Sequence, residues 1–224
     1  MSSYIKKLIQ LGEGQHLDFK FEISDSRKIA RTLAAFANTH GGTLLIGVKD
    51  NGSIAGVRSE EEYYMVQGAA NVFCRPEVKF LTHEWQVDGK TVLEITVPAS
   101  NKELYSAQDK DGTWKVYLRI NDQNLLANRV YLQARKRREG VKGVFLAYTD
   151  REKLLLSYLS NNFNITLSQF CRIGNIQRRH AEATLANLLA LDVIEQIITE
   201  AGCHYILSDS TTPFEYREPG YLKW

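Results

Sequence analysis

Apolar residues recur every three to four positions in residues 26–40, which predicts an amphipathic helix. The apolar face of this helix would carry Ile29, Leu33, Phe36 and Ala37. Gly41 and Gly42 would end the helix, because glycine is common just past the last helical residue. Residues 43–48 then form a short, nearly continuous apolar run, which predicts a strand buried on both faces.

Polar and apolar residues alternate after Pro76, as they do in half-buried strands. Two hairpin turns are expected, one at Asp88 and Gly89 and one at Asp111 and Gly112. The strands would cover residues 80–87, 91–97, 105–108 and 114–120. The first part of the chain is therefore predicted to be an α+β domain around a mainly antiparallel sheet.

Two local signals lie between the first helix and these strands. Asn51 and Gly52 suit a tight turn, after which residues 53–57 would return as a strand. Ser59 and Glu62 have the spacing of a capping box, which predicts the start of a further helix.

The second part of the chain has a different pattern, with three helical segments and then two strands. Two capping-box spacings predict helix starts, Thr149 with Glu152 and Thr166 with Gln169. Asn175 would cap the third helix, and residues 193–199 and 203–207 would form a hairpin. This order is typical of a winged helix-turn-helix. The predicted organisation is residues 1–142, residues 148–208 and a tail of residues 209–224.

Composition adds little about the partner and more about the compartment. A net charge of +2 over 224 residues is too mild to demand a polyanionic partner. The three cysteines, Cys74, Cys171 and Cys203, form no C-x-x-C pair, which argues against a disulfide framework or a structural zinc site. The N-terminus lacks a signal-peptide pattern, and no apolar stretch approaches membrane-spanning length. We therefore expect a cytoplasmic protein with no membrane partner.

Three carboxylates, Glu13, Asp18 and Asp50, stand beside predicted strands or turns. If they converged, they would repel one another unless a divalent cation lay between them. Mg²⁺ and Mn²⁺ prefer such oxygen ligands, and either ion could activate water against a phosphodiester. The alternative is structural: Asp18 pairs with Lys20, and Asp50 opens the turn that follows it.

Two strings of residues and a later strand resemble the Schlafen AlbA_2 domain family. The first string is E-x-x-x-x-D-F-K from Glu13, the second is A-F-A-N-x-x-G-G-x-L-L-I-G-V-x-D-x-G from Ala35, and the strand is Y-L-R-I. The resemblance implies an α+β domain linked to nucleic-acid binding, which in bacteria is often fused to a winged helix in transcriptional regulators.

The resemblance also implies roles for the acids. Animal Schlafens cleave structured RNA with a three-acid site, whose acids fall here on Glu13, Asp18 and Asp50. The family usually has glutamate at the position of Asp18. A carboxylate misplaced by about 1 Å can lower a catalytic rate roughly a hundredfold.

Basic residues supply the candidate contacts to phosphates and bases. Arginine can pair with guanine and glutamine with adenine, and the N-terminal turn of a recognition helix enters the major groove. The candidate nucleic-acid-binding residues are Lys20, Arg119, Arg135, Lys136, Arg137, Arg138, Arg172, Gln177, Arg178, Arg179 and His180. A solvated helix face is the alternative interpretation of residues 135–138.

The leading hypothesis is a nucleic-acid-binding protein that regulates transcription as a homodimer on duplex DNA. One alternative is a Mg²⁺- or Mn²⁺-dependent endoribonuclease that acts on RNA through Glu13, Asp18 and Asp50. The other is a protein-interaction module, because many winged helices contact proteins rather than nucleic acid. We expect binding rather than catalysis, with no cofactor required unless the acid site holds a metal.

Overall fold

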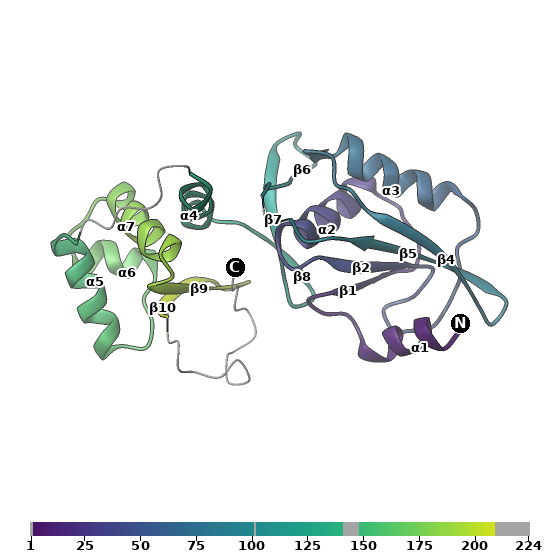
Figure 1. Cartoon of the computed structure of the whole chain (residues 1–224), viewed down its shortest axis with the longest axis horizontal. Coiled ribbons are helices and arrows are strands. Elements are labelled where there is room, and N and C mark those ends of the chain that lie inside the picture. Colours follow the sequence, from purple (N-terminus) through teal and green to yellow (C-terminus); the bar gives the residue numbers. More distant parts are fainter. Residues whose placement is uncertain (1, 101, 141–147, 209–224) are drawn as a thin grey trace. The chain divides into compact units, whose positions relative to one another are not determined.

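A computed structural model gives the fold and describes residues 2–100, 102–140 and 148–208 (Figure 1). The chain divides into two compact units, Met1–Leu126 and the part from Ala127 onwards. The described residues form seven helices, two four-stranded sheets and a two-stranded hairpin, so the fold class is α+β as predicted. None of the described helices is long and apolar enough to cross a membrane.

The first sheet of the first unit has the strand order β1-β2-β5-β4. Strands β1 and β2 are parallel, and the other neighbours are antiparallel. The bounds are β1 (Leu17–Lys20), β2 (Gly42–Ile46), β4 (Leu81–Val87) and β5 (Lys90–Val97). The predicted strands at residues 43–48, 80–87 and 91–97 are therefore confirmed to within a few residues.

Helices cover both faces of this sheet. On one face, α2 (Ser26–Asn38) and α3 (Glu61–Val72) share a core with Leu44 and Ile46 of β2. On the other face, α1 (Ser2–Leu11) packs on Leu45, which lies between them in sequence. The prediction that this strand is buried on both faces is confirmed, whereas the sequence patterns gave no indication of α1.

The second sheet is antiparallel throughout, with the order β3-β6-β7-β8. Its strands are β3 (Cys74–Arg75), β6 (Ser106–Gln108), β7 (Trp114–Ile120) and β8 (Gln123–Leu126). Helix α2 contacts strands of both sheets. The strand expected at residues 53–57 is reduced to a single bridge between Val48 and Ile54.

The second unit contains four helices and a hairpin among its described residues. The bounds are α4 (Arg129–Glu139), α5 (Asp150–Asn161), α6 (Leu167–Ile173), α7 (Arg178–Ala190), β9 (Ile194–Thr199) and β10 (Gly202–Leu207). Val130 and Ala134 of α4 are buried in one core with Leu185 of α7. Helix α4 thus belongs to the second unit, and the division falls after Leu126, earlier than the predicted boundary at residue 142.

Side chains cap the starts of α4, α5 and α6 in the second unit, whereas α7 has no side-chain cap. Both capping boxes predicted for this unit are present, Thr149 with Glu152 on α5 and Thr166 with Gln169 on α6. Asn175 does not cap α7. It has a positive φ of 48°, and Gln177 is the N-cap residue.

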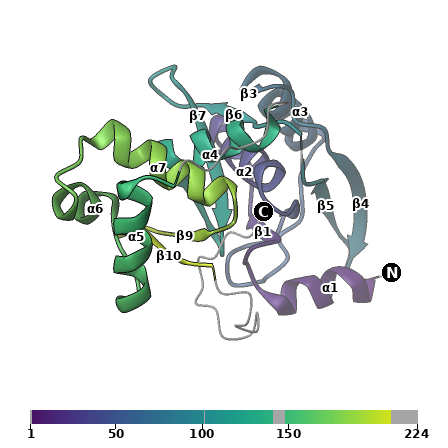
Figure 2. The ribbon, with the colours of Figure 1, turned by 60° about the vertical axis from the view of Figure 1, so that its left-hand side comes forward.

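Helices α5, α6 and α7 precede the β9-β10 hairpin, as Figure 2 shows. Ile165, just before α6, forms an isolated antiparallel bridge with Tyr205 of β10. The predicted tail, residues 209–224, lies outside the described residues.

Candidate nucleic-acid interface and carboxylate site

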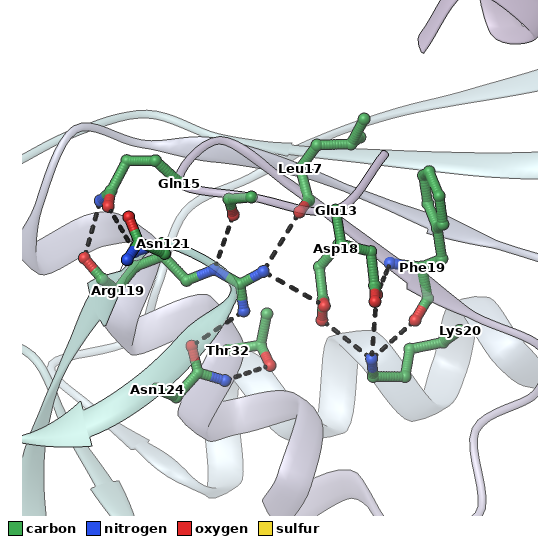
Figure 3. A network of polar contacts seen from close by, with 11 residues as sticks. Glu13, Gln15, Leu17, Asp18, Phe19, Lys20, Thr32, Arg119, Asn121 and Asn124 are labelled. Atoms are coloured by element: carbon green, nitrogen blue, oxygen red, sulfur yellow. Dashed lines mark hydrogen bonds and ion pairs between the residues drawn. The ribbon is translucent and has the colours of Figure 1, made fainter. Parts of the chain in front are cut away.

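Arg119, near the end of β7, is buried and holds the segment that leads into β1 (Figure 3). Its Nε atom donates a hydrogen bond to the carbonyl oxygen of Gly14 at 3.0 Å. Its Nη2 atom donates to the carbonyl oxygen of Leu17 at 3.1 Å and to Oδ1 of Asp18 at 3.3 Å. Arg119 is only 1% exposed, so its guanidinium is not available to a phosphate. The prediction that Arg119 binds nucleic acid is therefore wrong.

Lys20 pairs with Asp18 on the same face of β1, because alternate residues of a strand share a face. The Lys20 Nζ atom lies 3.0 Å from Oδ2 of Asp18, which is 4% exposed. The same Nζ atom donates to the carbonyl oxygen of Phe19 at 2.6 Å and lies 4.0 Å from Oε1 of Glu13. The ion pair between Asp18 and Lys20, which the sequence analysis gave as the structural alternative, is thus present.

Glu13 completes this cluster from the segment before β1. Its Oε1 atom accepts a hydrogen bond from the backbone N–H of Phe19 at 2.8 Å. Burial raises the pKa of Glu13, and the neighbouring Asp18 carboxylate raises it further. The Phe19 N–H and the Lys20 ammonium act in the opposite direction on the same pKa. Asp18 is therefore close enough to Glu13 to affect the pKa of the Glu13 carboxyl.

Asp50 does not join Glu13 and Asp18. It is exposed in the turn that follows β2. Within the described residues, no group of three or more His, Cys, Asp or Glu side chains lies close enough together to hold a metal ion. Both Asp18 oxygens already bind cationic side chains, so the residues present do not fit Mg²⁺ or Mn²⁺. The predicted three-carboxylate metal and catalytic site is not formed.

Most of the basic cluster on α4 is engaged within its own unit. Arg135 forms an ion pair with Glu139 at 2.7 Å. Arg138 donates to the carbonyl oxygen of Leu189 at 3.0 Å and forms an ion pair with Asp192.

The two middle residues of the α4 cluster differ in exposure. Arg137 is partly buried, and burial lowers the pKa of its guanidinium. Its Nη1 atom donates to the side-chain oxygen of Gln133 at 3.3 Å. Lys136 is exposed. Of residues 135–138, which were predicted to bind phosphates together, Lys136 is therefore the one that is exposed.

The N-terminal end of α7 and the turn before it present polar and basic side chains to solvent. The exposed residues are Arg172, Gln177, Arg178, Arg179 and His180. The opposite face of α7 is buried in the core of the second unit, which fixes the direction of the helix. The structure therefore places Gln177, Arg178, Arg179 and His180 at one exposed end of α7, and Arg172 in the last turn of α6.

Glu182 is a functional candidate that the sequence analysis missed. Its side chain is 4% exposed, and its Oε1 atom accepts a hydrogen bond from Nε of Arg178 at 3.0 Å. The signal for this contact was the spacing of four residues, which places the two side chains one helical turn apart.

Two solved structures resemble part of this chain. The match to the DIP2311 protein from Corynebacterium diphtheriae has a TM-score of 0.42 and 23% identity and covers 58% of this chain and 25% of that chain. The match to the N-terminal domain of a RecG-related protein from Nitrosomonas europaea has a TM-score of 0.33 and 19% identity. It covers 50% of this chain and 80% of that chain. This chain thus spans about a quarter of the length of the Corynebacterium protein. No curated protein matches the chain.

The family model described as Schlafen, AlbA_2 matches residues 13–128. This match covers more than half of the 224 residues and extends from Glu13 to just past β8. The chain therefore belongs to the Schlafen AlbA_2 family.

Proposed function

We propose that the protein binds duplex DNA as a transcriptional regulator. Residues 148–208 act as a winged helix-turn-helix, in which α7 is the recognition helix. The order of α5, α6, α7 and the β9-β10 hairpin supports this assignment, as does the isolated bridge between Ile165 and Tyr205 of β10. Membership of the Schlafen AlbA_2 family supports a nucleic-acid-binding role for the first unit.

The observation that carries the proposal is the exposed basic end of α7. Recognition helices place their N-terminal residues against base edges in the major groove. Arg178 and Arg179 can pair with guanine or hold phosphates, and Gln177 can pair with adenine. A helix anchored through Leu185 and Leu188 presents these side chains from a rigid base, which lowers the entropy lost on binding.

The β9-β10 tip contributes less than α7 to this interface. Glu200 lies between the two strands, and a negative charge there is repelled by phosphates. Regulators of this architecture bind paired half-sites as dimers, so we also propose that the protein is a homodimer. Sedimentation equilibrium of the full chain tests the dimer separately from DNA binding.

A direct binding experiment tests the proposal. Fluorescence anisotropy of a labelled duplex is measured with the full chain and with the double variant Arg178→Ala and Arg179→Ala. We expect the double variant to bind at least tenfold more weakly, because each lost arginine contact is worth ~1–3 kcal/mol. Lys28→Ala with Lys102→Ala removes the same charge from exposed positions in the first unit and serves as the matched control. Equal affinities of the double variant and the control would remove α7 from the interface.

A further inference from the structure

Oxygen atoms surround the ammonium group of Lys20 as they would surround a small bound cation (Figure 3). The Nζ atom lies 2.6 Å from the carbonyl oxygen of Phe19, 3.0 Å from Oδ2 of Asp18 and 4.0 Å from Oε1 of Glu13. We propose that Lys20 is the resident cation of this acid pair, and that the first unit holds Glu13 and Asp18 together without a divalent metal.

The charges at the site balance without any added ion. The two carboxylates of Glu13 and Asp18 face two cations, Lys20 and Arg119. Asp18 is held on both sides, by Lys20 at Oδ2 and by Arg119 at Oδ1. A divalent ion would add two positive charges beside an ammonium and a guanidinium, and like charges repel one another.

The backbone fixes the position from which Lys20 reaches the acids. The carbonyl oxygen of Lys20 accepts hydrogen bonds from the backbone N–H groups of Gly47 at 2.8 Å and Val48 at 3.3 Å. Lys20 also lies in register with Ile46 of β2. The side-chain stem therefore starts from a rigid strand, and alternation along β1 directs it to the side of Asp18. The sheet therefore fixes the point from which the Lys20 ammonium reaches the two acids.

A specific prediction separates this account from a metal site. Removal of the Lys20 ammonium would leave Oδ2 of Asp18, Oε1 of Glu13 and the carbonyl oxygen of Phe19 without the cation that they share, and oxygen ligands of this kind suit Mn²⁺. Lys20→Met keeps an apolar stem of similar length and should therefore create Mn²⁺ binding that the natural chain lacks. Lys20→Arg keeps a cation and should remain insensitive to Mn²⁺.

The experiment measures the thermal midpoint and bound Mn²⁺ of the full chain, with electron paramagnetic resonance reporting the free ion. The natural chain should show no Mn²⁺-dependent shift relative to EDTA. Lys20→Met should gain a shift of about 3 °C at an ion concentration about tenfold above its dissociation constant. The double variant Lys20→Met with Glu13→Gln should lose that gain. Lys28→Met, an exposed lysine of α2, is the control.

Two results would overturn the proposal. One is Mn²⁺ binding by the natural chain that Glu13→Gln abolishes. The other is a folded Lys20→Met variant that binds no more Mn²⁺ than the Lys28→Met control. If Lys20→Met does not fold, the comparison of the natural chain with Glu13→Gln decides alone: Mn²⁺ binding that differs between them contradicts the proposal, and no binding by either supports it.

Discussion

Buried Glu182 accepts a hydrogen bond at 3.0 Å from Nε of Arg178, one turn earlier on α7. The arginine side chain is 71% exposed, whereas the glutamate side chain is 4% exposed. The contact therefore holds the guanidinium of this exposed arginine through its Nε atom. The same guanidinium carries two Nη groups, which can make a bidentate contact with a base edge. Glu182 is thus a positioning residue for Arg178 within the proposed interface.

Glu182→Gln should lower sequence discrimination more than affinity for DNA in general. A preferred duplex is first selected from a randomised library with the natural chain, and a shuffled duplex provides the reference. We expect the ratio of the two affinities to fall roughly tenfold, because a well-held bidentate arginine contact gives ~1–3 kcal/mol of discrimination. Binding to the shuffled duplex should not weaken, because no positive charge is lost. An unchanged ratio would show that the anchor does not serve base recognition.

Arg119→Ala should destabilise the first unit by about 3–5 kcal/mol, because it leaves the buried Asp18 carboxylate without one of its partners. Urea unfolding followed by the fluorescence of Trp85 and Trp114 measures the change, since both residues lie in the first unit. Arg58→Ala, at an exposed position, should change the free energy of unfolding by less than about 0.5 kcal/mol. A loss below 1 kcal/mol in Arg119→Ala would contradict the structural role given to this residue.

Asp109 should make the first unit sensitive to acid. Hydrogen bonding from Lys115 is the largest of the effects that lower the pKa of Asp109, from 3.8 to about 2, and Arg31 also contributes. A carboxyl whose pKa is lowered by folding adds stability above its unfolded pKa. This stability is lost as the pH falls from 3.8 towards about 2. Asp109→Asn should therefore flatten the dependence of unfolding free energy on pH in this window. An identical pH profile in the variant would rule this linkage out.

Local sequence patterns predicted correctly those elements whose structure depends on residues close together in the sequence. The continuous apolar run around Leu44 and Leu45 predicted burial on both faces of β2, and the structure confirms it. The capping boxes at Thr149 and Thr166 predicted the starts of α5 and α6, because both partners of each box lie within one helical turn.

Long-range partners could not be predicted in this way. Arg119 was named as a candidate nucleic-acid contact, but Arg119 and its neighbours Leu118 and Ile120 are all buried at this end of β7. Arg138 was named as a candidate phosphate contact. Its partner Asp192 could not be predicted, because it lies 54 positions away in the sequence. Asp50 lies in the turn after β2 with its side chain exposed, and within the described residues it forms no three-acid group with Glu13 and Asp18.

The salt dependence of duplex binding tests the central claim most directly. Each phosphate contact contributes about −0.9 to the slope of log K against log[salt] for B-DNA. The double variant Arg178→Ala with Arg179→Ala should therefore have a slope shallower by up to about 1.8 than that of the natural chain, with part of this change lost where an arginine contacts a base instead. The Lys28→Ala with Lys102→Ala control should keep the natural slope. If the natural chain binds no duplex, or if all three slopes are the same, α7 is not the surface that meets DNA.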